Sequence, residues 1–508
     1  MIEHVFVLML ENRSFDHMLG FSSLAGTDAV SGEPTTVEGL TGGETNRLPS
    51  GEEIAASAGA DFSLTVDPPH NFEDVLEQLC GQGATYPDAA GRYPPITMSG
   101  FASRLAESAG SVDPSSVMRA FRPGQLPVIN ALAAEFAVCD HWFSSLPGPT
   151  WPNRCFVHAA SSAGLDDSPT MARSATALLD GYKFASGTIF DKLSAAGVPW
   201  GVAEGDALPQ VLSLSGMLEH VLEGRFFSIK DFAARVNDPA FADAYVFIEP
   251  HYGHVLADGR NFKCGNSQHP LDDVTRGEKL LKDVYETIRN SPLWESSLLI
   301  VLYDEHGGFY DHVVPPPAPP PGDPFSPDNN RHGFQFDQLG VRIPTLVISP
   351  YTTRGAIDHS VHDHTSVLAT VERLHGLDPL TARDAGAPGL DHLFALDSPR
   401  QDAPTRLPDP APSGIPDCGP DLDEQLLGVL ERVPAELAGP VDSTLVGFLQ
   451  VAMARELHLA AAARRDLGSA IDQEKDRLLS TYEQIHTKFD AVKFLRDVQA
   501  KYNAANHR

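Results

Sequence analysis

The chain lacks the short motifs that mark several common enzyme classes. It has no GxSxG turn, no P-loop, no HExxH helix and no GxGxxG after a predicted strand. Serine hydrolases, P-loop nucleotidases, zinc proteases and dinucleotide-dependent enzymes therefore have no motif to support them. The chemistry has to be sought in polar residues that follow the apolar segments.

Cysteines and basic residues are also scarce. The five cysteines are scattered and show no CxxC spacing, which predicts free thiols and no zinc knuckle. They are Cys80, Cys139, Cys155, Cys264 and Cys418. Lys and Arg number 37 against 68 Asp and Glu, which gives a net charge of −31. Such a chain repels nucleic acid and anionic lipid surfaces, so an anionic substrate must be held locally, by a metal or by a few arginines.

Long apolar runs and targeting features are absent from the pattern as well. No apolar stretch approaches the roughly 20 residues of a membrane-spanning helix. The first apolar run follows Met1 without a basic segment or a small-residue cleavage site. We therefore expect no stable membrane anchoring and a cytoplasmic location. A leader removed before Met1 would make a secreted or periplasmic location the alternative.

Two apolar runs end in acidic or amide residues. The run LLIVLY precedes Asp304 and Glu305, and the run HVFVLML precedes Glu11 and Asn12. Neither run alternates with polar residues, which is typical of strands covered on both faces of a parallel sheet. Because such strands end at one edge, the four side chains are predicted to form an all-oxygen site for Mg²⁺, Ca²⁺ or Mn²⁺. The alternative is a pair of surface loops with solvated carboxylates.

Thr150 stands in a proline-rich segment, GPTWPNR, ahead of a helix-like run that begins at Cys155. A Thr before a Pro in a first helical turn is by default a helix N-cap. The same position would also place a hydroxyl at the positive end of a helix beside Arg154, which suits phosphate binding. Arg154 and Arg13 are candidates for holding phosphate, although pairing with neighbouring carboxylates such as Asp16 is the simpler role.

Histidines recur in the loops around these segments: His70, His269, His306, His312 and His364. Each alone is a weak signal, since a loop histidine is often a solvated or helix-capping residue. Beside the acidic pair, His306 is a candidate to orient the carboxylates. Gly307 and Gly308 predict a turn in which no Cβ blocks close approach.

Helices and strands alternate along most of the chain, which indicates an α/β fold. We predict a catalytic domain over residues 1–395, with insertions near 21–67 and 313–340. A Pro-rich linker over 396–420 and a C-terminal helical segment over 421–508 follow it. In that segment, helices are predicted over 421–432 and 441–465, and one polar helix over 471–503.

Five blocks carry a family resemblance: EHVFVLMLENRSFDHMLG (3–20), GPTWPNR (148–154), GNSQHP (265–270), YDEHGGFYDHVVPP (303–316) and DHTS (363–366). They resemble, in order, the signature blocks of the bacterial phosphoesterase family that includes phosphatidylcholine-type phospholipases C and respiratory-burst-inhibiting acid phosphatases. The resemblance implies an alkaline-phosphatase-like three-layer sandwich with a central, mostly parallel sheet.

The resemblance also implies roles for individual residues. It places the metal on Glu11, Asn12, Asp304 and Glu305, with Thr150 as the nucleophile beside it. It places His70 and His269 around the phosphate. Relatives carry a further histidine between the second and third blocks. Here the stretch GRFFSIKDF (224–232) lacks one, and His220 is the nearest candidate for the leaving-group acid.

These residues fit metal-assisted phosphoryl transfer through a phosphothreonine at Thr150, with a histidine protonating the leaving oxygen. The expected enzyme is a phospholipase C acting on phospholipid head groups. An acid phosphatase is the alternative, and a catalytically silent metal- or phosphate-binding protein is the alternative of another class. Nearby histidines add Zn²⁺ to the candidate cations. Five aromatic residues would line an apolar entrance or belong to the core: Trp142, Phe143, Trp151, Phe309 and Tyr310.

Overall fold

The computed structural model describes residues 2–109, 112–171, 179–253, 263–416, 439–441, 443–464 and 469–506. A ten-stranded sheet forms its centre. In spatial order the strands are β10 Phe226–Ser228, β9 Trp200–Glu204, β11 Tyr245–Ile248, β1 His4–Leu10, β12 Ser297–Tyr303, β13 Leu346–Ile348, β8 Ala137–Cys139, β14 Ala356–Asp358, β2 Ala25–Asp28 and β3 Pro34–Thr36. All neighbours are parallel except the pairs of β13 and the β2–β3 pair. The predicted α/β class with a mostly parallel sheet is confirmed.

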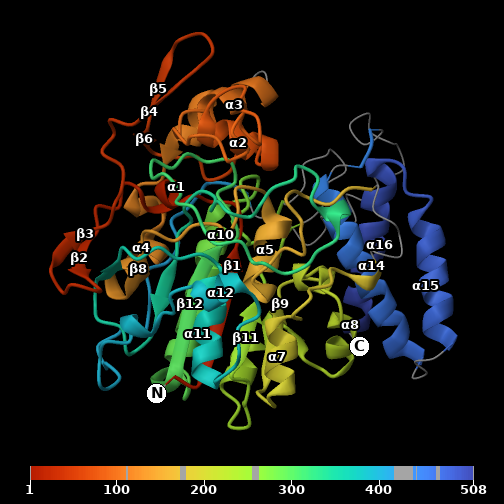
Figure 1. Cartoon of the computed structure of the whole chain (residues 1–508). Coiled ribbons are helices and arrows are strands. Elements are labelled where there is room, and N and C mark those ends of the chain that lie inside the picture. Colours follow the sequence, from red (N-terminus) through yellow and green to blue (C-terminus); the bar gives the residue numbers. More distant parts are fainter. Residues whose placement is uncertain are drawn as a thin grey trace.

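Helices cover both faces of this sheet (Figure 1). On one side, α5 (Thr150–Ala159) contacts α7 (Ile189–Ala195) and α11 (Thr365–His375). On the other side lie α4 (Pro127–Glu135), α9 (Phe232–Val236) and α10 (Val274–Arg289), and α10 contacts both of the others. The result is the three-layer arrangement that the family resemblance implied.

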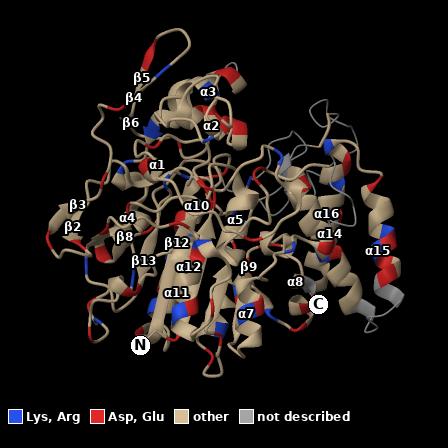
Figure 2. Cartoon of the chain, viewed as in Figure 1, with Lys and Arg blue, Asp and Glu red and all other residues tan. Residues whose placement is uncertain are grey.

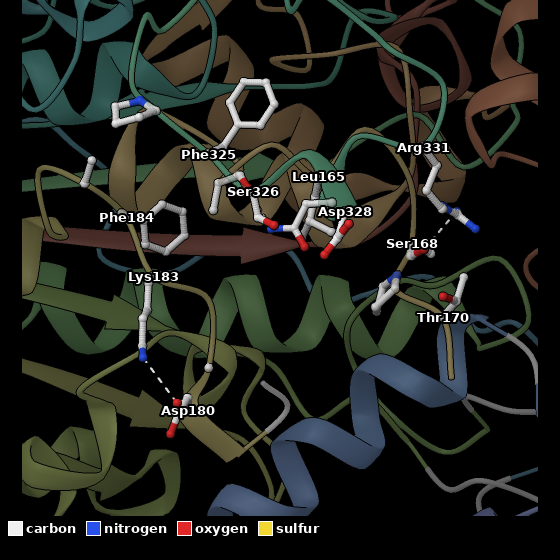
Figure 3. Close-up of a pocket in the computed structure, with 16 residues that line it drawn as sticks. Leu165, Ser168, Thr170, Asp180, Lys183, Phe184, Phe325, Ser326, Asp328 and Arg331 are labelled. Atoms are coloured by element: carbon white, nitrogen blue, oxygen red, sulfur yellow. Dashed lines mark hydrogen bonds and ion pairs between the residues drawn. The ribbon is translucent and has the colours of Figure 1, made fainter. Parts of the chain in front are cut away.

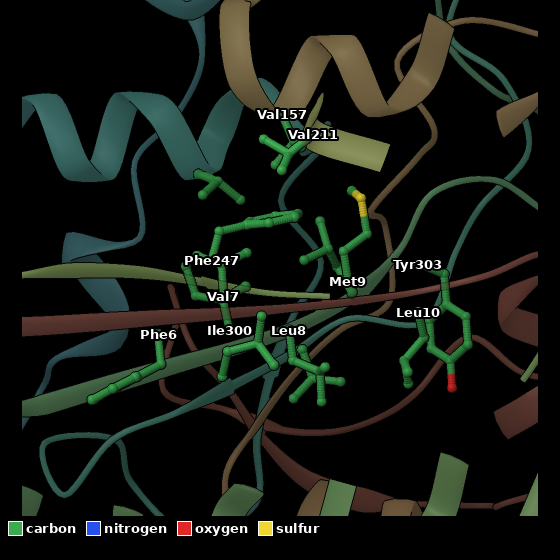
Figure 4. Close-up of a cluster of buried hydrophobic side chains, with 14 of the residues drawn as sticks. Phe6, Val7, Leu8, Met9, Leu10, Val157, Val211, Phe247, Ile300 and Tyr303 are labelled. Atoms are coloured by element: carbon green, nitrogen blue, oxygen red, sulfur yellow. The ribbon is translucent and has the colours of Figure 1, made fainter. Parts of the chain in front are cut away.

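Strand β1 shows why two helical layers are needed. Its residues from Val5 to Leu10 are all buried. Met9 lies on the side of Val157 in α5, whereas Phe6 lies on the opposite side (Figure 4). There the Phe6 ring meets Phe232 of α9 edge-on, with centroids 5.9 Å apart. A strand that is apolar on both faces is stable only when both faces are covered.

Smaller elements surround this core. The residues near 21–67 hold the β2–β3 hairpin, which extends the central sheet, and a second hairpin of β4 and β5. The remaining strands and helices are β4 Thr45–Arg47, β5 Glu53–Ala55, β6 Ser57–Ala58, β7 Arg119–Ala120, α1 Phe15–Leu19, α2 Phe72–Cys80, α3 Phe101–Ala109, α8 Met217–Leu222 and α12 Ala382–Gly386. The short 3₁₀ turns are η1 Pro114–Met118, η2 Pro123–Gln125, η3 Gln210–Ser213, η4 Ile229–Asp231, η5 Trp294–Ser296, η6 Pro327–Asn329 and η7 Asp391–Leu393.

Acidic residues lie on α2, α7 and α15 and in many loops (Figure 2).

The C-terminal helices are α14 (Ser443–Arg464), α15 (Ser469–Tyr482) and α16 (Lys488–Asn506). The single polar helix predicted over 471–503 is wrong, because a new helix starts near Thr487. The Thr487 N–H donates to Asp490 Oδ2 at 3.0 Å, and the Asp490 N–H donates to Thr487 Oγ1 at 3.2 Å. This reciprocal pair is a capping box, which begins a helix. The helix predicted over 421–432 lies outside the described residues.

Helix α14 packs against η3, α8 and the two other C-terminal helices. It contains an 18-residue window, Leu445–Ala462, of mean hydropathy 1.2, which is long and apolar enough to cross a membrane. The prediction that no stretch approaches that length is therefore wrong. Within the structure 72% of the window is buried, as in the core helix of a globular protein.

The segment predicted as a linker is tied to α10 over part of its length. Lys282 Nζ donates to the Leu407 carbonyl at 2.7 Å, and the Tyr285 hydroxyl donates to the Pro404 carbonyl at 2.6 Å.

Among the cysteines within the described residues, one departs from the prediction. Cys80, Cys139 and Cys155 carry thiols, whereas Cys264 is disulfide-bonded. The prediction of a free thiol is thus wrong for Cys264. Sequence spacing gave no signal, because a disulfide depends on which Cα atoms the tertiary fold brings within bonding reach.

Candidate active site

The two predicted acidic pairs lie at the same edge of the sheet. Leu10 of β1 is in register with Tyr303 of β12, so both strands end side by side. The Asn12 N–H donates to Asp304 Oδ1 at 2.9 Å, and the Asn12 side-chain amide donates to Glu305 Oε1. Glu11 and Asn12 are 1% exposed, and both acidic residues after β12 are fully buried. The structure thus confirms that the two strand ends converge.

The backbone at this edge is unusual. Asn12 has a φ of 59°, a left-handed conformation that Asn tolerates better than most residues. Gly307 has a φ of +64°, and a Cβ added to it would lie 2.2 Å from the Asn12 carbonyl oxygen. The backbone at Gly307 therefore approaches the backbone of Asn12 closely, as predicted for this glycine turn. This contact brings the segments after β12 and β1 together.

Thr150 is the first residue of α5, and the N-cap position belongs to Pro149. The default interpretation of Thr150 as a helix cap is therefore wrong. Its Oγ1 instead lies 3.4 Å from Asn12 Nδ2. The helix starts ahead of the predicted Cys155 because proline is tolerated in a first turn. The Asn153 amide also fixes the preceding loop by donating to the Gly148 carbonyl at 2.9 Å.

Arg154 follows Thr150 by one helical turn and is 4% exposed. Its Nε donates to Asp304 Oδ2 at 3.1 Å, and a second nitrogen lies 3.7 Å from Glu11 Oε1. Its third contact is the Tyr252 hydroxyl, which accepts from Nη1 at 2.9 Å. The guanidinium thus pairs with the site carboxylates, the simpler of the two predicted roles.

Arg13 does not pair with Asp16, so that prediction is wrong. Arg13 donates to the Gln268 carbonyl at 2.7 Å and lies 2.9 Å from His17 Nε2. Asp16 pairs instead with Arg342 at 3.0 Å.

His70 and His269 line one small cavity with Glu11 and Thr150. His70 Nδ1 donates to the Pro68 carbonyl at 2.6 Å, so its Nε2 faces the site, 3.3 Å from Asn12 Nδ2 and 3.8 Å from Glu305 Oε1. His269 Nε2 lies 3.6 Å from Asp67 Oδ2. Both histidines that the family resemblance selected thus border Thr150.

The other histidines are placed around this cavity or away from it. His306 Nδ1 lies 3.1 Å from Glu305 Oε2, and its Nε2 lies 2.8 Å from Gln78 Oε1, which orients the carboxylate. His364 Nε2 donates to the Asp304 carbonyl at 2.7 Å. His220 lies on α8 beside Glu223 at 3.3 Å and does not line the cavity. His312 pairs with Asp16 at 2.7 Å.

The sequence analysis missed several residues in and around the cavity. The most informative is Glu249, which is not among the lining residues but follows β11, the neighbour of β1, just as Glu11 follows β1. Its carboxylate accepts from the backbone N–H of Gln210 at 2.7 Å, and the Gln210 side chain donates to Glu11 Oε1 at 2.8 Å. The repeated pattern of an apolar strand ending in an acid was visible in the sequence. No local signal indicated Asp67, Ser168 or Phe448, which do line the cavity.

Buried negative charge dominates the electrostatics of the site. Burial raises the pKa of Glu11 to about 8, with Asp304 adding to the rise and Arg154 opposing it. Burial likewise raises the pKa of Asp304 to about 6. Burial alone would lower the pKa of His70, but Glu305 and Asp67 raise it to about 9. Burial lowers the pKa of His269 well below its usual range, helped by the charges of His70 and Arg13.

This donor set fits a hard divalent cation. Glu11 Oε2 and Asn12 Oδ1 are buried and have no hydrogen-bond partner among the described residues. They lie beside the Thr150 hydroxyl and Glu305, and carboxylate, amide and hydroxyl oxygens are the ligands that Mg²⁺, Ca²⁺ and Mn²⁺ prefer. A cation would also offset the surplus of buried carboxylates that raises the pKa values of Glu11 and Asp304.

A larger cavity of about 870 Å³ adjoins the site, and Ser168 lines both spaces. Leu165, Phe184 and Phe325 stand around it (Figure 3). Of the five aromatic residues considered for an entrance, only Trp151 lines the small cavity. The others are core residues, between 0% and 7% exposed: Trp142, Phe143, Phe309 and Tyr310.

A model of the Phosphoesterase family matches residues 2–378. The chain belongs to the phosphoesterase family. This membership confirms the resemblance of the five sequence blocks and, with it, the class of phosphoric ester hydrolase.

Relatives support the assignment to the phosphoesterase family. The chain is 37% identical to "Non-specific phospholipase C6" of Arabidopsis thaliana over 431 residues, which cover 81% of this chain and 76% of that protein. It is 30% identical to "Phospholipase C B" of Mycobacterium tuberculosis over 488 residues, covering 87% and 88%. Among solved structures, an alkaline phosphatase superfamily protein from Vibrio parahaemolyticus aligns with a TM-score of 0.29 and 15% identity, covering 52% of this chain and 64% of that one.

Proposed function

We propose that this phosphoesterase is a metal-dependent phospholipase C that cleaves phospholipids through a covalent phosphothreonine at Thr150. The observation that carries the proposal is that the Thr150 hydroxyl, at the start of α5, meets the polar residues that follow β1 and β12. Thr150 Oγ1 and His70 Nε2 lie 3.4 and 3.3 Å from the same Asn12 amide nitrogen, which also contacts Glu305.

The cation would be held by Glu11, Asn12, Thr150, Asp304 and Glu305. When bound, it would lower the pKa of the threonine hydroxyl and neutralise phosphate oxygens. Arg154 and His306 hold the carboxylates in place through the contacts described above. Thr150 is partly exposed, so its proton has a path to water.

The reaction then proceeds in two displacements. Thr150 Oγ attacks the phosphorus, and the bond from phosphorus to the glycerol oxygen breaks. His70, whose Nε2 faces the site, gives its proton to that leaving oxygen. Water then attacks the phosphothreonine ester, which releases the phosphorylated head group and restores the hydroxyl. His269 donates a hydrogen bond to a phosphate oxygen.

Two observations favour a phospholipid over a small phosphomonoester. The relatives are named as phospholipases C. In addition, the rings of Trp151 and Phe448, which line the small cavity with Thr150, meet edge-on with centroids 5.4 Å apart. The 870 Å³ cavity, which shares Ser168 with the small one, has mixed walls, in which apolar residues such as Phe184 and Phe325 stand beside charged ones. A diacylglycerol leaving group needs apolar surface such as these rings provide, whereas a phosphomonoester needs only a small polar pocket.

Hydrolysis of p-nitrophenyl phosphorylcholine and p-nitrophenyl phosphate by metal-stripped and metal-restored enzyme tests the proposal. We expect metal-restored wild type to prefer the phosphorylcholine ester, and Thr150→Val to lose about 10³-fold or more of its kcat. Equal activity without metal would contradict metal dependence. A preference for p-nitrophenyl phosphate would favour an acid phosphatase. No turnover of either ester with any metal would favour the binding protein.

The role of His70 has its own test, because p-nitrophenolate leaves without a proton and a glycerol oxygen does not. His70→Asn should slow cleavage of phosphatidylcholine by about 10²- to 10⁴-fold and spare most turnover of the p-nitrophenyl ester. His269→Asn is the matched control and should slow both substrates alike. An equal loss on both substrates for His70→Asn would remove it as the leaving-group acid.

A further inference from the structure

A second cluster of ligand-type side chains lies at the same edge of the sheet, away from Thr150. Cys139 ends β8 and Asp358 ends β14, and the two residues are in register in adjacent parallel strands. His362 follows in the loop before α11, and His392 reaches the same point from η7. None of these residues lines the active-site cavity.

The two imidazoles converge on one carboxylate oxygen, and the thiol of Cys139 lies close to it. His362 Nε2 lies 2.9 Å and His392 Nε2 lies 2.8 Å from Asp358 Oδ2. The ligand atoms of Cys139, Asp358 and His362 all lie within 4.8 Å of one another. These three residues are at most 1% exposed, whereas the His392 side chain is 31% exposed and gives access from solvent.

Both imidazole rings are held in orientation by hydrogen bonds on the side that faces away from Asp358. His362 Nδ1 lies 3.0 Å from the Ser366 hydroxyl, and the His392 ring bonds to the backbone of Gly389. This arrangement, in which the outer nitrogen bonds to oxygen and the inner nitrogen faces the centre, is typical of metal-bound histidines. Asp358 Oδ1 is oriented too, because it accepts the Ser360 N–H at 3.0 Å.

A comparison within the chain sets this cluster apart. The acidic cluster of Asp16, Asp311 and His312 also has metal-ligand spacing, but Arg342 already donates to both carboxylates, at 3.0 and 2.8 Å. Among the described ion pairs, Asp358 pairs with the two histidines and with no lysine or arginine.

We propose that Cys139, Asp358, His362 and His392 bind a zinc ion. One thiolate, two imidazoles and one carboxylate are a four-ligand set for tetrahedral Zn²⁺, and the sulfur and nitrogen donors disfavour Mg²⁺ and Ca²⁺. The site is thus chemically distinct from the all-oxygen set at Thr150. With four protein ligands it leaves no position for a substrate, so its role is structural.

The zinc would fix the loop that supports the catalytic edge. His362 lies two residues before His364, and His364 Nε2 donates to the Asp304 carbonyl at 2.7 Å. The ion would also link the ends of β8 and β14 to η7. The competing interpretation is a metal-free hydrogen-bonded network in which a protonated His392 neutralises Asp358.

Metal content and cobalt spectra distinguish the two interpretations. We expect one tightly bound zinc per chain in wild type, kept after brief chelation that removes a catalytic cation. Replacing it with Co²⁺ should give thiolate-to-cobalt charge transfer and the visible bands of tetrahedral cobalt. His392→Asn should lose the zinc, and Cys139→Ser should lose both the zinc and the charge-transfer band. Ser366→Ala should weaken binding about 10- to 100-fold.

Cys155→Ser is the matched control, since Cys155 is a second buried thiol outside the cluster. It should keep the zinc and the cobalt spectrum. Glu305→Gln, which alters only the catalytic set, should keep them too. The proposal would be overturned if folded wild type held no zinc and gave no thiolate–cobalt band. It would also be contradicted if the His392→Asn variant retained stoichiometric zinc. Because His392 is partly exposed, its substitution tests the site even if the Cys139 variant fails to fold.

Discussion

Individual residues at the candidate catalytic edge are held by backbone geometry as well as by side-chain hydrogen bonds. Gly307 combines a φ of +64° with a separation of 2.2 Å between an added Cβ and the Asn12 carbonyl oxygen. The Asn12 amide in turn touches Thr150 and Glu305. A side chain at Gly307 would therefore displace the residue on which the whole donor set converges.

Gly307→Ala should lower both activity and stability, because the added Cβ would overlap the backbone of Asn12. The left-handed backbone costs about 1 kcal/mol for alanine, and the overlap with Asn12 should shift the donor set, with a loss of about 10²-fold in kcat. Gly333→Ala is the control, because Gly333 has a similar φ of +71° and open space around its Cβ position. Kinetics and thermal unfolding of both variants measure the difference. Equal activity of the two variants would contradict the role assigned to Gly307.

His332 gives a pH-dependent prediction at a position away from the catalytic set. Its Nε2 lies 3.1 Å from Asp167 Oδ2. Burial alone would lower the pKa of His332, but Asp167 and Asp166 raise it above its usual value. A raised pKa in the folded state means that the stabilisation is complete below about pH 6.5 and is lost as the pH rises through the raised value.

His332→Asn should therefore lower the Tm more at pH 6 than at pH 9. The difference in stability should be no more than about 1 kcal/mol, because the pair is partly exposed. Thermal unfolding of both proteins at the two pH values is the measurement. A gap that stays constant, or grows, toward pH 9 would contradict the pairing.

Residue-level prediction from the sequence succeeded where strand ends carried the signal. The meeting of Glu11, Asn12, Asp304 and Glu305 was predicted because a parallel sheet brings the ends of its strands to one edge. Partners that come from distant loops could not be found this way. The disulfide of Cys264 and the lining residue Phe448 depend on tertiary contacts that leave no local pattern.

At the scale of elements, the C-terminal helices are docked to the edge of the sheet by a buried ion pair. Arg455 of α14, 1% exposed, pairs with Glu204 at the end of β9. The hydroxyl of Tyr502 in α16 donates to the same carboxylate at 2.6 Å. One acidic residue of the catalytic sheet thus holds two of these helices.

Arg455→Met should destabilise the protein by about 3 to 5 kcal/mol, because it leaves the buried carboxylate of Glu204 without a cation. Adding Glu204→Gln should recover much of the loss. Arg477→Met is the control, since Arg477 is 47% exposed and its ion pairs should contribute about 1 kcal/mol or less. Denaturant unfolding measures all of these changes. Equal effects of the two single arginine variants would show that the Arg455 pair does not dock the helices.

Elements with a continuous apolar run were predicted well, and those set by the local start of a helix or by pairing direction were not. The all-apolar β1 and β12 were visible in the sequence. The early start of α5 depends on a proline that is tolerated in its first turn, and the break between α15 and α16 follows from the capping box of Thr487 and Asp490. The antiparallel direction of β13 follows from its neighbours in the sheet.

For the whole molecule, the net charge of −31 should control access to lipid surfaces. On vesicles containing anionic lipid, the initial rate should be low at 0.01 M salt and rise toward 0.15 M, as the screening length falls from about 30 to 8 Å. Zwitterionic phosphatidylcholine vesicles serve as the control and should show little salt dependence. A rate on anionic vesicles that falls with added salt would point to a basic docking surface and contradict this prediction.

Covalent catalysis by Thr150 is the step on which the proposed function depends, and rapid quenching tests it most directly. Metal-restored enzyme is mixed with p-nitrophenyl phosphorylcholine, quenched within the first turnover and mapped by peptide mass spectrometry. We predict a burst of p-nitrophenolate and a phosphorylcholine adduct on Thr150, both missing in Thr150→Val. Turnover without a burst or adduct in wild type, retained in Thr150→Val, would contradict Thr150 as the nucleophile.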